Sequence, residues 1–176
     1  MMPGFILKKF LLFVGGFFVI FYAAFFLLLL LYSGPGEIDE EDYAYQLVTN
    51  WFAGLQIPQN QIELIDSYTL SGAWSGDGEA GFSVRVSGLN EALITGHDGV
   101  VRGDSLTAEL DNALEFVADL YGGGELNWFP RYQEVLTPEY YVYPFTLDVF
   151  DNTTDSARLL ILHPADAMAY FVYVKI

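Results

Sequence analysis

The spacing of hydrophobic and polar residues changes along the chain, and each spacing predicts a different element. The first long hydrophobic run, 10–32, contains no charged residue. As a helix that rises about 1.5 Å per residue, this run is long enough to cross a hydrocarbon core of about 30 Å. We therefore predict that 10–32 forms a transmembrane anchor.

Charged residues on either side of this run predict its orientation. Lys8 and Lys9 precede the run, and the acidic residues begin at Glu37. By the positive-inside rule, 1–9 stay in the cytoplasm and the C-terminal part lies outside the plasma (inner) membrane. A cleaved signal is the alternative, but its hydrophobic stretch is typically shorter, at about 7 to 15 residues. We expect a single-pass protein in which 33–38 is a short linker.

The pattern after the linker predicts a helix followed by two strands. Large hydrophobic residues recur at every fourth position from Tyr43 to Leu55, which is the spacing of an amphipathic helix. Two extended segments follow, at 62–74 and around the alternating Phe82, Val84 and Val86, and the glycine-rich stretch between them is typical of a hairpin turn. The pattern of 88–103 leaves the structure of that segment open.

The rest of the chain predicts a second helix and three strands. The helix begins near Asp104 or Ser105, and the triple glycine at 122–124 ends it. Three extended segments separated by turn-forming residues then indicate an antiparallel meander at 140–150, 158–162 and 168–176. We predict an α+β fold for 39–176, with one antiparallel sheet and two helices packed on a face, in the order α-β-β-(unassigned)-α-β-β-β.

The charge of the region after the anchor limits its partners. This region contains five basic residues against 23 acidic ones, which gives a formal charge of −18. Such a surface repels phosphate backbones, so we exclude nucleic acid as a partner. Divalent cations and basic proteins are compatible with this charge. The chain has no cysteine, which favours a bacterial or archaeal envelope and excludes thiol chemistry.

The residues that carry chemistry form no specific motif. His97 and His163 lie in different turns, and their spacing fits no zinc site. Asp77 and Glu79 lack the residue pattern of a calcium loop, and the glycines around them indicate a turn. His97 and Asp98 are adjacent, but neighbouring side chains diverge along an extended chain, and no nucleophile motif accompanies them. We predict no catalytic residue, no metal site and no cofactor, and we do not expect an enzyme.

Two groups of residues are candidates for partner binding. Aromatic residues are enriched at protein interfaces, although burial against a sheet is their commoner fate. The aromatic candidates are Trp128, Phe129, Tyr132, Tyr140, Tyr141 and Tyr143. On the second helix, Asp111, Glu115 and Asp119 recur at every fourth position and form an acidic stripe. This stripe is either a solvated helix face or a docking edge for a basic partner or cations.

Two hypotheses for function follow from these patterns. The first is a non-enzymatic, membrane-anchored accessory or assembly subunit of a larger membrane complex. The short linker favours this hypothesis, because it keeps the domain close to the exported surfaces of neighbouring membrane or envelope proteins. The second is an extracytoplasmic sensor or binding domain for a small ligand or a divalent cation, with a pocket between the sheet and the second helix.

Overall fold

The chain divides into two compact units, residues 1–39 and 40–176. The computed structural model describes Phe18, Phe21, Tyr22 and residues 40–71, 78–121, 126–150 and 153–175. The three described residues of the first unit are helical. None of the helices among the described residues is long and apolar enough to span a membrane. The rest of the predicted anchor, 10–32, lies outside the described residues, as do the predicted cytoplasmic end, 1–9, and the linker, 33–38.

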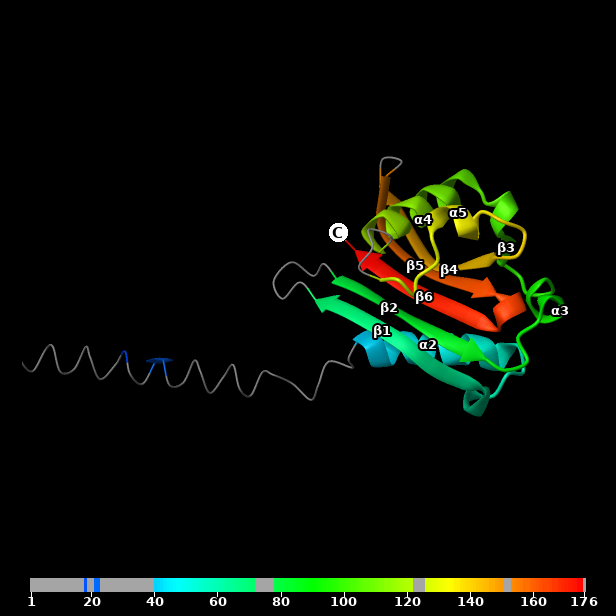
Figure 1. The fold of residues 1–176 in the computed structure, drawn as a ribbon. Helices are drawn as coiled ribbons and strands as arrows, with labels where there is room; N and C mark the ends of the chain where they lie inside the picture. The colour runs from blue at the N-terminus through cyan, green and yellow to red at the C-terminus, as the bar shows by residue number, and fades with distance from the viewer. Residues whose placement is uncertain are drawn as a thin grey trace, which may run out of the picture. The chain divides into compact units, whose positions relative to one another are not determined.

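The second unit is built around one six-stranded sheet in the order β1-β2-β6-β5-β4-β3, and every neighbouring pair of strands is antiparallel (Figure 1). The strands are β1 Ile62–Ser71, β2 Gly78–Val86, β3 Val101–Arg102, β4 Tyr141–Phe150, β5 Thr153–His163 and β6 Met168–Lys175. The predicted α+β fold with one antiparallel sheet is therefore confirmed. β5 begins five residues before the predicted start, within the segment expected to form a turn.

Helices cover both faces of this sheet. The helices are α2 Glu40–Gly54, α3 Glu91–Ile94, α4 Ala108–Tyr121 and α5 Tyr132–Val135, and three short 3-10 turns are η1 Gln59–Gln61, η2 Gly103–Ser105 and η3 Pro164–Asp166. α2 lies on one face, and α4 and α5 lie on the other (Figure 1). We predicted both long helices on one face, so that part of the prediction is wrong. The reason is visible in β5, where Leu159, Leu160, Ile161 and Leu162 are all fully buried and neither face can remain open to solvent.

Each face has its own hydrophobic core. Under α2, Phe52 packs with Phe82 of β2 and Phe171 of β6, and the last two rings stack with centroids 5.0 Å apart. On the other face, Leu114 and Val117 of α4 pack against the opposite side of β5. Full burial of one such side chain stabilises the fold by about 1.5 to 3 kcal/mol. The two cores therefore fix α2 and α4 on the sheet independently of each other.

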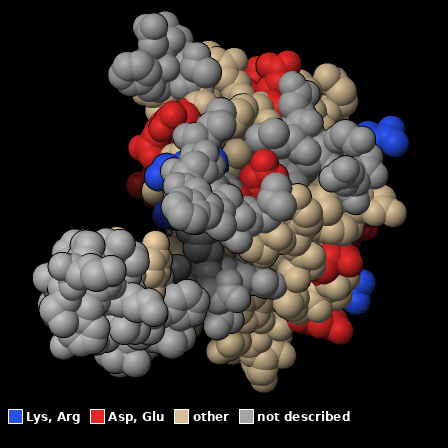
Figure 2. All heavy atoms as spheres, turned by 90° about the vertical axis from the view of Figure 1, so that its left-hand side faces the viewer, with Lys and Arg blue, Asp and Glu red and all other residues tan. Residues whose placement is uncertain are grey.

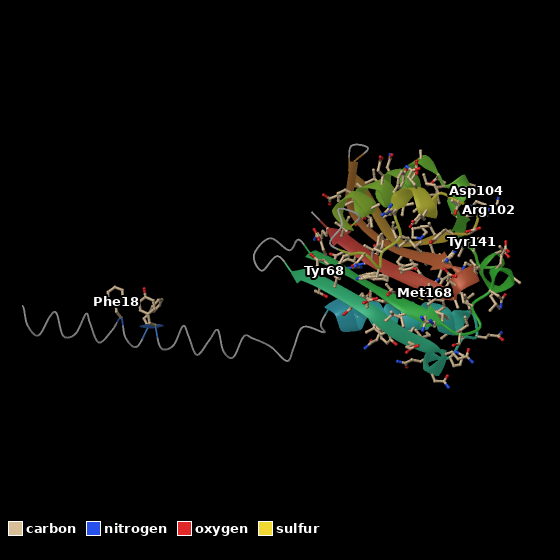
Figure 3. All side chains as sticks on the ribbon, in the orientation of Figure 1. Phe18, Tyr68, Arg102, Asp104, Tyr141 and Met168 are labelled. Atoms are coloured by element: carbon tan, nitrogen blue, oxygen red, sulfur yellow. The ribbon has the colours of Figure 1, made fainter. Side chains whose placement is uncertain are left out.

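α4 begins at Ala108, several residues after the predicted start. Asp104 is not a helix cap, because its carboxylate accepts two hydrogen bonds from Arg102, at 2.6 and 2.9 Å. Both residues lie at the end of the sheet near Tyr141 (Figure 3). The hydroxyl of Thr107 instead accepts a hydrogen bond from the N–H of Leu110 at 3.3 Å and caps the helix. The segment left open by the sequence, 88–103, contains α3 and β3.

Candidate functional site

The six aromatic candidates do not form one surface. Phe129 and Tyr141 are buried, and the other four are half-buried. Trp128, Phe129, Tyr132 and Tyr140 belong to the core on the α4 face, whereas Tyr141 and Tyr143 belong to the core on the α2 face. The sheet therefore divides the group, and a partner on one face would not contact the residues on the other. Partner binding by these residues stays a prediction.

The aromatic hydroxyls and rings have partners within the domain. The hydroxyl of Tyr132 donates a hydrogen bond to Asp111 at 2.7 Å, and that of Tyr141 donates to Glu91 at 2.6 Å. The bond to Asp111 together with burial raises the pKa of Tyr132 to about 12, and burial together with the bond to Glu91 raises the pKa of Tyr141 to about 12. Burial is the largest cause that raises the pKa of Tyr140, also to about 12. These hydroxyls stabilise the fold in their neutral form.

The acidic stripe on α4 is only partly available to a partner. Asp111 is half-buried and holds the hydroxyl of Tyr132. Glu115 is exposed, and the side chain of Asp119 lies outside the described residues. A basic partner on this helix would have to share Asp111 with Tyr132. The docking role of the stripe stays a prediction.

His97 and Asp98 do not form a catalytic pair. Nδ1 of His97 lies 2.9 Å from the backbone carbonyl oxygen of Asp98, and the carboxylate of Asp98 is exposed. The His97 ring lies 4.9 Å from the ring of Trp51 and edge-on to Tyr143, so it packs at the end of α2. Of the two acidic residues in the glycine-rich stretch, Asp77 lies outside the described residues and Glu79 is half-buried in β2. No group of three or more acidic or histidine side chains in the described ranges is arranged to hold a metal ion.

A groove of about 450 Å³ opens at the α3 end of the sheet. Its walls come from three loops and contain Asn90, Glu91, Pro138, Glu139, Tyr141, Pro164 and Ala165. Two of these residues are acidic and none is basic, so the groove attracts positive charge. No local sequence motif predicts this site, because its residues come from three separate segments of the chain. Glu91 and Tyr141, for example, are 50 positions apart.

His163 is buried next to this groove and is only 8 % exposed. Its ring stacks on Tyr140, with centroids 4.2 Å apart. Nε2 lies 3.9 Å from the carboxylate of Glu139, and Nδ1 lies 3.1 Å from that of Asp166 but without the angle of a hydrogen bond. His163 therefore connects β5, η3 and the loop before β4 by packing, and its position does not point to catalysis.

The outer edge of β1 is the second candidate surface. Among the described residues, β1 pairs with β2 alone. A β-bulge at Ile65 breaks the alternation of this strand, and it leaves the neighbouring Leu64 and Ile65 exposed by 46 % and 38 %. Two apolar side chains are thus exposed side by side in the first half of an edge strand, and the outer edge of such a strand offers main-chain hydrogen-bonding groups.

The opposite edge of the sheet has features that discourage strand pairing. The two-residue β3 covers the start of β4. Further along β4, Pro144 cannot donate a backbone hydrogen bond, and the strand has irregular register after Pro144 and again at Asp148. Proline and bulges are the usual protection of an edge strand against added strands. β1 contains no proline and only one bulge, so an added strand can pair with β1 more easily than with β4.

Comparison of the chain with protein-family models, with curated proteins and with solved structures found no match.

Proposed function

We propose that this chain is a non-enzymatic accessory or assembly subunit of a membrane complex, held in the membrane by the predicted anchor at 10–32. In this proposal the extracytoplasmic domain binds an extended segment of a partner protein along β1. The observation that carries the proposal is the contrast between the two sheet edges. In residues 62–67, β1 pairs with β2 alone among the described residues and exposes Leu64 and Ile65, whereas β4 is protected by β3, Pro144 and irregular register.

Strand addition fits the chemistry of this edge. An added strand would form main-chain hydrogen bonds with β1, and the apolar side chains exposed on β1 would supply specificity. Leu64 and Ile65 are already about half buried, so covering each would stabilise the complex by about 1 kcal/mol. The main-chain bonds therefore supply affinity, and the two apolar residues define where along β1 the partner lies.

Charge favours a basic partner over a second copy of the chain. Glu63 and Asp66 flank the two exposed apolar residues, and Asp66 is exposed on the edge strand. If two copies paired their β1 strands antiparallel about Leu64 and Ile65, Glu63 of each would face Asp66 of the other. Like charges opposite each other destabilise a strand pair, and two regions of formal charge −18 repel. A partner segment with lysine or arginine residues would avoid both kinds of repulsion.

Site-specific photo-crosslinking in intact membranes tests the proposal. A photoreactive residue placed at Ser67, which is exposed on β1, should form a covalent product with one reproducible partner protein. The same residue placed at Asn112, which is exposed on α4, is the matched control and should not yield that product. Changing Ile65 to lysine should reduce the Ser67 product, because the added charge opposes a basic strand. Equal products from both positions, or none from Ser67, would contradict the proposal.

A second candidate function is a binding domain for a small cationic ligand or a divalent cation. The predicted place of the pocket, between the sheet and the second helix, is occupied by the core under α4. The candidate is supported instead by the groove at the α3 end, where Glu91 and Glu139 line a volume of about 450 Å³. A ligand that binds only the folded domain raises its melting temperature. Calcium, magnesium and a diamine should therefore each be tested on the full chain in neutral detergent, with Glu139→Gln as the comparison. Melting curves that do not move with any of the three would remove this candidate.

A further inference from the structure

A second pocket, of about 370 Å³, lies at the opposite end of the sheet, where α2 begins. Its walls include Asp148, Asp155, Ser156, Arg158, Tyr173 and Lys175. The guanidinium carbon of Arg158 is 5.9 Å from the ring centroid of Tyr43, in the first turns of α2, which fixes the position of the pocket. Figure 2 shows this end of the domain, where basic and acidic side chains lie close together.

Arg158 is held in place by contact with aromatic rings. Its guanidinium carbon lies 4.6 Å from the ring centroid of Tyr173. Arg158 faces Tyr173 across β5 and β6, and Lys175 faces Ser156 in the same pair of strands, so both cations reach the same side of the sheet. Neither cation makes an ion pair with a described residue. Two of the five basic residues after the anchor therefore converge on one pocket, and no carboxylate in the described part of the chain forms an ion pair with either.

The same pocket contains two carboxylates that are also without ion pairs among the described residues. Asp148 accepts a hydrogen bond from the hydroxyl of Ser156 at 2.7 Å, which orients the carboxylate, and Asp155 is exposed beside it. The pocket thus presents two cationic and two anionic side chains that form no ion pairs with each other. This arrangement suits a zwitterionic ligand, which has one positive and one negative group. Such a ligand is also favoured by the net charge of the domain, which repels a simple anion but leaves a neutral zwitterion unaffected.

We propose that this pocket binds the headgroup of a phospholipid that has a phosphate and a primary amine, the chemistry of phosphatidylethanolamine. Arg158 and Lys175 would bind the phosphate through charge-assisted hydrogen bonds, and Asp148 and Asp155 would accept hydrogen bonds from the ammonium group. The lipid source rests on the anchor of the proposed function: the predicted linker, 33–38, reaches at most about 20 Å, so α2 begins close to the membrane surface.

Calorimetric titration of the full chain in neutral detergent tests this assignment. Short-chain phosphatidylethanolamine should bind, and short-chain phosphatidylcholine should bind more weakly, because its quaternary ammonium cannot donate hydrogen bonds to the carboxylates. Arg158→Gln should weaken binding of phosphatidylethanolamine by about tenfold or more, as expected from the loss of hydrogen bonds to a charged group. Asp148→Asn should reduce the preference for phosphatidylethanolamine over phosphatidylcholine.

The control is Arg131→Gln, which removes the same charge at an exposed position of another segment and should leave binding unchanged. Thermal melting of each variant identifies any loss of folding. Titration with soluble phosphoethanolamine distinguishes a lipid headgroup from a free soluble ligand of the same chemistry. If phosphoethanolamine binds and the lipid does not, the lipid assignment is overturned. Equal affinity of wild-type and Arg158→Gln chains for phosphatidylethanolamine would overturn the site itself. The titration contains no partner protein, so its failure is distinct from failure of the crosslinking at β1.

Discussion

Addition of a single methyl group at Gly103 should destabilise the fold strongly. Gly103 begins the 3-10 turn after β3 and lies against the segment that leads from α5 to β4. A Cβ atom added here would lie 1.9 Å from the carbonyl oxygen of Val135 and 2.7 Å from that of Thr137. Real Cβ atoms essentially never approach closer than 3.0 Å. Both neighbours are backbone atoms, so neither can rotate away, and the backbone must move by about 1 Å to relieve the clash.

The expected loss of stability for Gly103→Ala is about 2 to 4 kcal/mol. Overpacking of this kind costs about 1 to 3 kcal/mol. The N–H of Gly103 also donates a hydrogen bond to the carbonyl oxygen of Tyr140 at 2.8 Å, and a backbone shift weakens this bond, which contributes about 1 kcal/mol. Denaturant unfolding of the full chain in neutral detergent, followed by tryptophan fluorescence, measures the difference from the wild-type chain.

Gly54→Ala is the matched control for this experiment. Gly54 is the last residue of α2, and a Cβ atom added there meets nothing within 4 Å. Alanine is a better helix former than glycine, so this variant should be as stable as the wild-type chain or more stable by up to about 1 kcal/mol. A Gly103→Ala chain that unfolds at the same denaturant concentration as the Gly54→Ala chain would refute the close packing of η2 against the segment before β4.

Three further predictions concern the cores and the buried hydroxyls. Phe171→Ala should cost about 3 to 5 kcal/mol in the same unfolding experiment, because it removes a fully buried ring; a cost below about 1 kcal/mol would contradict its central place in the core. Tyr132→Phe should cost about 1 to 2 kcal/mol, because Asp111 loses a hydrogen bond in a partly buried position, and an unchanged midpoint would argue against that bond. The pKa values of Tyr132, Tyr140 and Tyr141 are raised to about 12 from 10, so their stabilising effect should be complete below pH 10 and lost as pH rises through 12. Ultraviolet titration of tyrosinate should show this late ionisation together with unfolding, and full ionisation near pH 10 in the folded chain would contradict it.

Local spacing was enough to predict most of the helices and strands. The hydrophobic spacing of four residues from Tyr43 predicted α2 but not its buried face, because Tyr43 is 48 % exposed and the buried stripe runs through Ala44, Val48 and Phe52. The alternation around Val84 predicted β2, where Phe82, Val84 and Val86 are buried. The start of α4 was missed because Asp104 looks like a cap in sequence but is held by Arg102 in space. Nothing in the local pattern indicates that Thr107 takes over the capping role.

The placement of the helices on both faces was missed although the sequence contained a signal for it. The continuous apolar run 159–162 in β5 is what a strand covered on both faces requires, whereas a strand open on one face alternates. The missing alternation in this run is therefore the sequence signal for helices on both faces of the sheet.

The candidate sites depend on pairings that no local pattern contains. β2 pairs with β6, whose residues lie about 90 positions further along the chain, and this pairing is what leaves β1 at an edge. The groove at the α3 end and the pocket around Arg158 likewise bring together residues from separate loops and strands. Their chemistry follows from the sheet order, so it could be found only after the fold was known.

Hydrogen exchange along β1 tests the central claim most directly, namely that the outer edge of this strand is where a partner binds. The amides of residues 62–67 should be compared in the full chain within native membranes and in the same chain purified in neutral detergent. Strand addition predicts slower exchange for these amides in native membranes, while the amides of β5, which have strand partners on both sides, exchange equally slowly in the two samples. Equal exchange of 62–67 in both samples would contradict the claim.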